Sequence, residues 1–322
     1  MGQRIVALGK NLHFTLVTAD QASQDTFCIV NSVHFVEIST SGDGQLHLST
    51  VDNFSEMLSA TMETHTDIPI VVCVEDISQP TKRNACSLCG AYLILSMGLN
   101  VDQACATVRK AVCPADGPNP DILSDDVRSC WQALEHARSL CWLGPHVGDQ
   151  DPAFDIEAAS HYACPANGGV RELVPGRLFH FPAPRPLPPG TAWANLAEPG
   201  RPAGRAFSAP FLAELLADLG ASAVVCLGRA PAGDAAAFRA EDLDVHDLAL
   251  AGPRPALLGA MDRLLAVSRA AAPGAVALFG GPEGMPGAGG DVAGTLAAAL
   301  LMMEHGFGEA AAAAWLRMVG PM

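Results

Sequence analysis

Apolar residues gather into short continuous runs in both halves of the chain. Residues 68–74 read Ile-Pro-Ile-Val-Val-Cys-Val, and residues 274–279 read Gly-Ala-Val-Ala-Leu-Phe. Runs of this length without polar alternation are typical of strands buried on both faces of a parallel sheet. Shorter runs predict three further strands, at 27–31, 35–38 and 222–227.

Helical spacing of apolar residues follows each of the two long runs. In the first half a loop at 75–80 leads to predicted helices at 82–99 and 101–112. In the second half a glycine-rich loop at 280–290 leads to predicted helices at 291–304 and 307–319, and another helix at 256–270 precedes the run. We expect Trp315, within the last helix, to pack in the core.

The order of strand, loop, helix and helix therefore occurs twice. It predicts an α/β protein with two tandem domains, each a central, mostly parallel sheet flanked by helices. Glycine, proline and polar residues between 143 and 169 are typical of an exposed connection. We therefore predict a first domain at 1–145, a linker at 146–169 and a second domain at 170–322. A proline-rich stretch at 181–190, continued at 198–204, is expected to form a long surface loop.

The composition narrows the class of protein. The 322 residues are 49% hydrophobic and 16% charged, which favours a folded globular chain over a disordered one. The formal net charge of −15 excludes the basic surface that nucleic-acid binding requires. Residues 1–165 carry 8 Lys and Arg against 20 Asp and Glu, and residues 166–322 carry 11 against 14. The acidity therefore belongs to the first half.

The ten cysteines have no spacing that indicates a disulfide framework, so we expect reduced thiols. No apolar run is long enough to span a membrane, and the first ten residues lack the pattern of a secretory signal. These features predict a cytoplasmic protein.

Six short motifs, spread over nearly the whole chain, then point to one family. They are Leu12-His-Phe-Thr, the stretch from Thr81-Lys-Arg-Asn-Ala to Gly90-Ala-Tyr, Phe154-Asp-Ile-Glu, Val174-Pro-Gly-Arg-Leu-Phe-His-Phe, Gly294-Thr-Leu-Ala-Ala-Ala-Leu-Leu-Met-Met-Glu-His and Ala314-Trp-Leu-Arg-Met-Val-Gly-Pro. In this order they resemble landmarks of the cell-division-cycle-14 type of dual-specificity protein phosphatase. The resemblance implies two tandem phosphatase-like domains of the protein-tyrosine-phosphatase kind, with the chemistry in the second.

The family's signature places a His and a nucleophilic Cys where a strand enters the phosphate-binding loop. Aligned with it, this chain has Phe279 at the His position and Gly280 at the Cys position, and no cysteine follows Cys226. The signature Arg falls on Pro286 or, with gaps moved, on Val292.

The general-acid Asp falls on Ala251, four positions after Asp247. Thiolate, anion clamp and proton donor are each needed for this chemistry. The resemblance therefore implies a pseudophosphatase with no catalytic residues and no cofactor.

We accordingly expect a scaffold or binding protein. The family acts at spindle, centrosome and ciliary structures, so the resemblance implies a cytoskeletal or axonemal assembly. The acidic first domain suits a basic partner surface. Two alternatives stay open: an active dual-specificity phosphatase with a rearranged site, and a phosphopeptide-binding module.

Other candidate chemistry is weaker. The glycine-rich loop at 280–290 opens a helix and offers backbone N–H groups to an anion, but Glu283 in the loop and Asp291 directly after it repel phosphate. Cys86 and Cys89 together with His161 and Cys164 have spacings that zinc sites use, although the first pair fits buried helical thiols better. Cys73 ends a strand as a phosphatase nucleophile does, but Glu75 and Asp76 follow it and disfavour a thiolate. We therefore predict no metal site.

Overall fold

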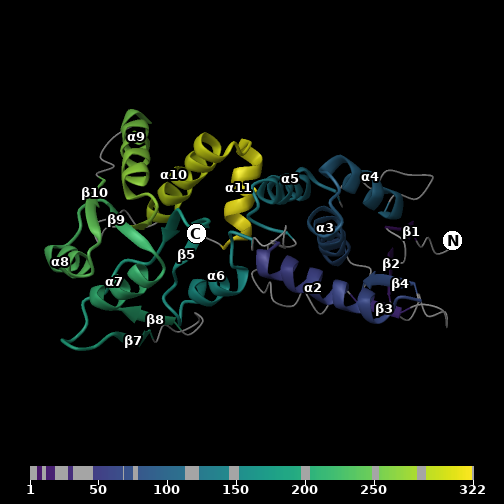
Figure 1. The fold of residues 1–322 in the computed structure, drawn as a ribbon, viewed down its shortest axis with the longest axis horizontal. Helices are drawn as coiled ribbons and strands as arrows, with labels where there is room; N and C mark the ends of the chain where they lie inside the picture. The colour runs from purple at the N-terminus through teal and green to yellow at the C-terminus, as the bar shows by residue number, and fades with distance from the viewer. Residues whose placement is uncertain are drawn as a thin grey trace. The chain divides into compact units, whose positions relative to one another are not determined.

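The chain forms two compact units in a computed structural model (Figure 1). Unit 1 consists of residues 1–152 and 313–318, and unit 2 consists of residues 153–312 and 319–322. The structure describes residues 6–8, 12–18, 28–31, 46–67, 69–74, 79–112, 123–144, 152–196, 204–248, 254–280 and 288–320. Both units are α/β with parallel strands, as the sequence predicts.

Unit 1 contains a four-stranded sheet in the order β1-β2-β4-β3. Its strands are β1 (Val6–Ala7), β2 (Leu12–Thr18), β3 (Cys28–Asn31) and β4 (Ile70–Val74). β4 lies in the middle and pairs in parallel with both β2 and β3, while β1 adds an antiparallel edge. The predicted strands at 27–31 and 68–74 are therefore confirmed, and the one at 35–38 lies outside the described residues.

The helices in the described part of unit 1 include α2 (Leu48–Thr64), α3 (Gln79–Leu95), α4 (Val101–Val112) and α5 (Asp125–Ser139). α3 follows the central strand and packs against α2, α4 and α5. Trp131 of α5 is fully buried, and its indole Nε1 donates a hydrogen bond of 3.0 Å to the Ser87 carbonyl of α3. The ring lies so close to α3 that a Cβ added at Gly90 would be 1.9 Å from Trp131 Cζ2.

The last helix of the chain, α11 (Glu309–Met318), contributes residues 313–318 to unit 1. Trp315 is fully buried, as predicted, and its ring centroid lies 5.4 Å from that of Trp142. Arg317 and Asp126 form an ion pair of 3.6 Å on the exposed side. Because both charged side chains are largely exposed, the two tryptophans contribute most of the stabilisation here.

Unit 2 is built on a five-stranded sheet in the order β10-β9-β11-β6-β5. Its strands are β5 (Arg171–Val174), β6 (Leu178–His180), β9 (Ala221–Leu227), β10 (Asp244–Asp247) and β11 (Ala275–Gly280). All neighbours are parallel except β5, which is antiparallel to β6. A separate ribbon pairs β7 (Trp193–Leu196) with β8 (Gly204–Phe207).

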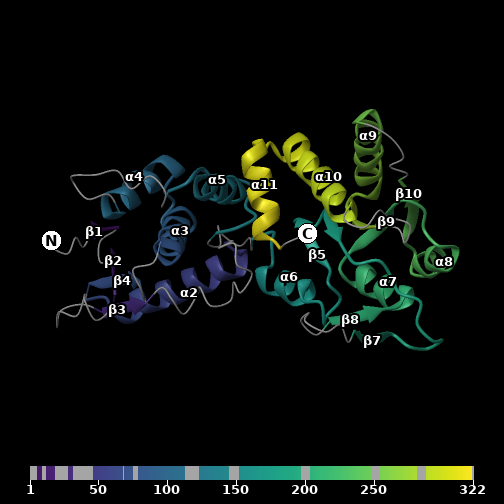
Figure 2. The same cartoon turned by 180° about the vertical axis from the view of Figure 1, so that it is seen from behind.

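Helices cover both faces of this sheet. α7 (Ala209–Asp218) and α8 (Ala232–Ala240) share one buried cluster with β9 and β11. α9 (Arg254–Ala271) contacts β9 and β11, and α10 (Ala288–His305) contacts β11 and β5. Neither helix contributes a residue to that cluster, so both cover the other face. Figure 2 shows α9 and α10 on one side of the sheet and α7 on the other. Unit 2 is thus a three-layer α/β/α arrangement.

Three predicted segments differ from the structure. The expected linker at 146–169 contains helix α6 (Ile156–Ala163), whose N-terminus is capped by the Asp155 carboxylate accepting a hydrogen bond of 2.9 Å from Ala158 N. The glycine-rich loop is shorter than expected, because α10 begins at Ala288. The helix expected at 82–99 runs from Gln79 to Leu95, because Gly98, at φ +74°, adopts the left-handed conformation that ends helices.

Candidate functional site

The parallel strands of unit 2 bring their carboxyl ends to one edge of the sheet, which is where open α/β sheets bind ligands. Across this edge the strand register aligns three residues: Phe279 of β11 is opposite Cys226 of β9, and Cys226 is opposite Asp247 of β10. Gly280 follows Phe279 and is opposite Leu227. We call these residues and Gly280 the carboxyl edge of unit 2.

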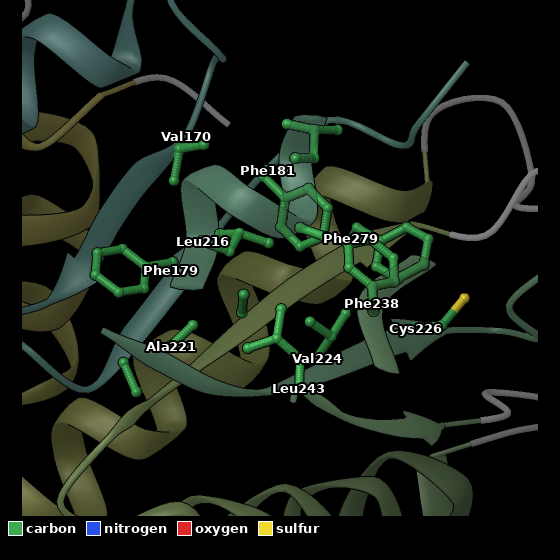
Figure 3. Close-up of a cluster of buried hydrophobic side chains, with 14 of the residues drawn as sticks. Val170, Phe179, Phe181, Leu216, Ala221, Val224, Cys226, Phe238, Leu243 and Phe279 are labelled. Carbon is green, nitrogen blue, oxygen red and sulfur yellow. The ribbon is translucent and has the colours of Figure 1, made fainter. Parts of the chain in front are cut away.

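Phe279 belongs to the core of unit 2. Its side chain is fully buried, and its ring centroid lies 5.1 Å from that of Phe181 and 5.9 Å from that of Phe238. Phe181 and Phe238 are themselves 6.0 Å apart, so the three rings form a closed triangle (Figure 3). Tilted rings at these separations are a favourable aromatic arrangement. Phe279 therefore has no polar group with which it could orient a nucleophile, as a His at this position could.

Gly280 ends β11 and carries no side chain. The other two positions aligned with catalytic residues, Ala251 and Pro286, lie outside the described residues. The sequence nevertheless shows which catalytic residue types are missing from this region. No cysteine follows Cys226, and no arginine stands between Arg269 and Arg317.

Cys226 lies beside the expected nucleophile position, because it is opposite Phe279, the residue before Gly280. It is fully buried, at the margin of the cluster drawn in Figure 3. Burial, together with the Asp247 and Asp234 carboxylates, raises the pKa of the Cys226 thiol to about 12. The thiol is therefore protonated at neutral pH, whereas cysteine catalysis requires a pKa lowered below the ordinary value.

The backbone of Cys226 also forms hydrogen bonds with the residues that follow β9 and β10. Its carbonyl accepts hydrogen bonds from Gly228 N at 2.9 Å and from Leu248 N at 2.8 Å. The Asp247 carboxylate accepts one of 2.9 Å from Ala230 N. Asp247 thus holds the loop after β9, and it lies two strands from β11, a separation of about 10 Å at the usual strand spacing. A proton donor for a group bound at Gly280 would have to be closer.

His180, at the end of β6, is a titratable residue that no sequence motif marks as a candidate site residue. Burial, and secondarily the positive charge of Arg171, lowers the pKa of His180 to about 4. Arg171 is its direct cross-strand partner on β5. The imidazole is therefore neutral at physiological pH. His180 could have been identified as a perturbed titratable residue only from the pairing of β5 with β6, which a single sequence does not reveal.

The remaining sequence candidates are dispersed. Cys86 and Cys89 are buried in α3, which confirms them as buried helical thiols, and burial raises the pKa of Cys89 well above its usual range. His161 and Cys164 are exposed at the end of α6. In the part of the chain that the structure describes, no three His, Cys, Asp or Glu residues are arranged to hold a metal ion. Cys73 lies on the central strand β4, opposite Asn31 of β3.

Comparison with known proteins adds no family assignment. No protein-family model matches the chain, and no curated protein matches it significantly. Among the described residues, no helix is both long and apolar enough to cross a lipid bilayer.

Proposed function

We propose that this protein is a catalytically inactive homologue of dual-specificity phosphatases, with two tandem phosphatase-like domains, that acts as a scaffold or binding protein. The observation that carries the proposal is the carboxyl edge of unit 2. There the position aligned with the signature His is the buried Phe279, and the position aligned with the nucleophile is Gly280.

The chemistry of phosphoryl transfer through cysteine explains why this edge is decisive. The reaction needs a thiolate to form the phosphoenzyme, donors and an Arg to hold the phosphoryl oxygens, and an acid to protonate the leaving alcohol. Removing a single donor of the oxyanion type costs about 10²–10³ in rate, and removing the thiol removes the covalent step altogether. Cys226 does not substitute for the nucleophile, because its thiol is neutral and buried.

The fold within each unit supports the tandem architecture. In each unit a short apolar run forms a central strand with parallel neighbours on both sides, and a helix follows that strand. This is the order that the resemblance implies. The partner that we propose presents a basic surface to the acidic first half, whose net charge is −12. The setting that we propose, a cytoskeletal or axonemal assembly, is drawn from the resemblance alone.

A turnover assay tests the absence of catalysis. Purified full-length protein is incubated with para-nitrophenyl phosphate and with a phosphoserine-proline peptide, and we expect hydrolysis no faster than in protein-free buffer. Cys226→Ala and Cys73→Ala serve as matched variants and should behave as the unmodified chain does. Turnover that disappears in either variant would overturn the proposal and establish a rearranged thiol site.

A second measurement separates scaffolding from phosphopeptide recognition. Isothermal calorimetry compares the phosphopeptide with its unphosphorylated form, and we expect no difference in affinity. A tenfold preference for the phosphorylated form would instead establish a phosphopeptide-binding module.

A further inference from the structure

The segment between β6 and β7 has a sequence that restricts its own backbone. Residues 182–189 read Pro-Ala-Pro-Arg-Pro-Leu-Pro-Pro. Each proline fixes its φ near −65°, and each residue before a proline is pushed away from the helical region towards extended or polyproline II conformations. The structure shows neither helix nor strand from 181 to 188. The segment is thus an extended proline-rich stretch, about 25 Å long at the rise of a polyproline II helix.

Side-chain exposure along this segment repeats every three residues, which is the period of polyproline II. Pro182, Arg185 and Pro188 form one edge and are all exposed. The second edge holds Ala183, Pro186 and Pro189, of which the last two are exposed. On the third edge, Pro184 and Leu187 are both half-buried. The segment therefore lies with one edge towards its own unit and presents the other two outward.

Fixed contacts hold the segment in this orientation. At its start Phe181 is fully buried, and its N–H donates a hydrogen bond of 3.0 Å to the Leu278 carbonyl of β11. In its middle Arg185 N donates one of 2.9 Å to the Phe207 carbonyl of β8.

A turn closes the other end. Thr191 N donates a hydrogen bond of 3.0 Å to the Pro188 carbonyl, and Gly190 has a φ of +78°. Proline followed by a glycine of positive φ is the signature of a type II turn. Because both ends are anchored, little conformational entropy remains to be lost on binding.

From these observations we propose that residues 182–189 are a docking segment for a proline-recognition domain of the SH3 class. Such domains bind two edges of a polyproline II helix in a groove lined by aromatic rings. Pro186-Leu-Pro-Pro189 supplies the P-x-x-P spacing. The exposed Arg185 directly before it supplies a cation for an acidic pocket beside that groove, and a charged hydrogen bond there fixes the direction of binding. This proposal is independent of the inactive phosphatase site.

The test measures binding of the full-length chain to a panel of purified SH3 domains known to prefer arginine-containing P-x-x-P peptides. Each ¹⁵N-labelled domain is titrated with the chain and followed by NMR. We expect at least one domain to bind through its aromatic groove. A synthetic peptide of residues 181–191 should displace the chain from that domain.

Variants then locate the contact. Arg185→Glu and Pro188→Ala change exposed side chains, and each should weaken binding at least tenfold. Arg229→Ala, which removes another exposed arginine of unit 2, should leave the affinity within twofold. Thermal unfolding verifies that all three variants fold. The proposal is overturned if no domain of the panel binds the chain, or if binding persists within twofold in both Arg185→Glu and Pro188→Ala.

Discussion

Units 1 and 2 share an arrangement of four strands, β1-β2-β4-β3 and β5-β6-β11-β9, to which unit 2 adds β10, but their cores differ. In both, a five- or six-residue apolar strand lies between two parallel neighbours: β4 between β2 and β3, and β11 between β9 and β6. In unit 1 a single indole, that of Trp131, fills the space against the helix that follows the strand. In unit 2 three phenylalanine rings pack together on one face of the sheet, and one of them, Phe279, is the last residue but one of the central strand.

This difference shows that the residues near the carboxyl end of the central strand decide what the adjacent edge of the sheet can do. The apolar run determines that a strand is central and buried, whatever follows it. The side chain near its carboxyl end determines whether the edge beside it can do chemistry. In unit 2 that side chain, Phe279, is committed to packing.

The largest expected effect comes from breaking the aromatic triangle of unit 2. Phe279→Ala should destabilise the protein by about 3–5 kcal/mol, the usual cost of deleting a buried phenylalanine ring. Urea unfolding measures the loss, and hydrogen exchange should locate it in β9 and β11 rather than in α3 and α5. Phe279→Leu is the matched control and should cost less than about 1.5 kcal/mol. An alanine variant as stable as the leucine variant would show that the triangle is not the core of this unit.

The corresponding test in unit 1 adds one methyl group. Gly90→Ala forces a Cβ to within 1.9 Å of Trp131 Cζ2, so the indole or the helix must move. We expect a loss of about 3 kcal/mol, at the upper end of overpacking costs. Gly259→Ala in α9 is the control, because nothing lies within 4 Å of the added Cβ. That variant should gain about 0.5–1 kcal/mol from helix propensity. Equal effects in thermal unfolding would contradict the close packing of Trp131 on α3.

A pH dependence distinguishes unit 2 through His180. Its pKa is about 4 in the folded chain and about 6.5 when unfolded, so the unfolded state binds the proton more readily. Stability from this residue is therefore complete above pH 6.5 and is lost as the pH falls towards 4. Between pH 7 and 5 the loss should be about 2 kcal/mol relative to His180→Gln, which does not titrate. Parallel unfolding curves for the two proteins over this range would refute the burial of a neutral imidazole.

The smallest effect concerns reactivity and leaves stability unchanged. With a pKa of about 12, Cys226 is a thiolate in only about one molecule in 10⁴ at pH 8. Iodoacetamide should therefore label the exposed Cys141 and Cys164 long before it labels Cys226. Peptide mapping by mass spectrometry follows the three sites in one sample of native protein. Labelling of Cys226 at the rate of Cys141 would mean that the carboxyl edge holds an activated thiol.

Local sequence signals were sufficient for several elements. The helix predicted at 101–112 is α4, because Asn100 and Gln103 cap its start reciprocally: Gln103 N donates to Asn100 Oδ1 and Asn100 N donates to Gln103 Oε1. The prediction for α9 is correct to within two residues. Helix α6 was missed because its eight residues lie among glycine and proline punctuation, and its only clear signal is the Asp155 cap.

At the candidate site, the sequence determined by itself which residue types are missing, because cysteine and arginine can be counted without a fold. It also determined the two apolar central strands and the acidity of the first half, which are properties of neighbouring residues. Only the tertiary structure decided that Cys226 stands between Phe279 and Asp247, that His180 is half-buried opposite Arg171, and that residues 313–318 belong to unit 1. Those facts depend on strand register and on packing between segments far apart in the chain, and neither leaves a periodic mark in one sequence.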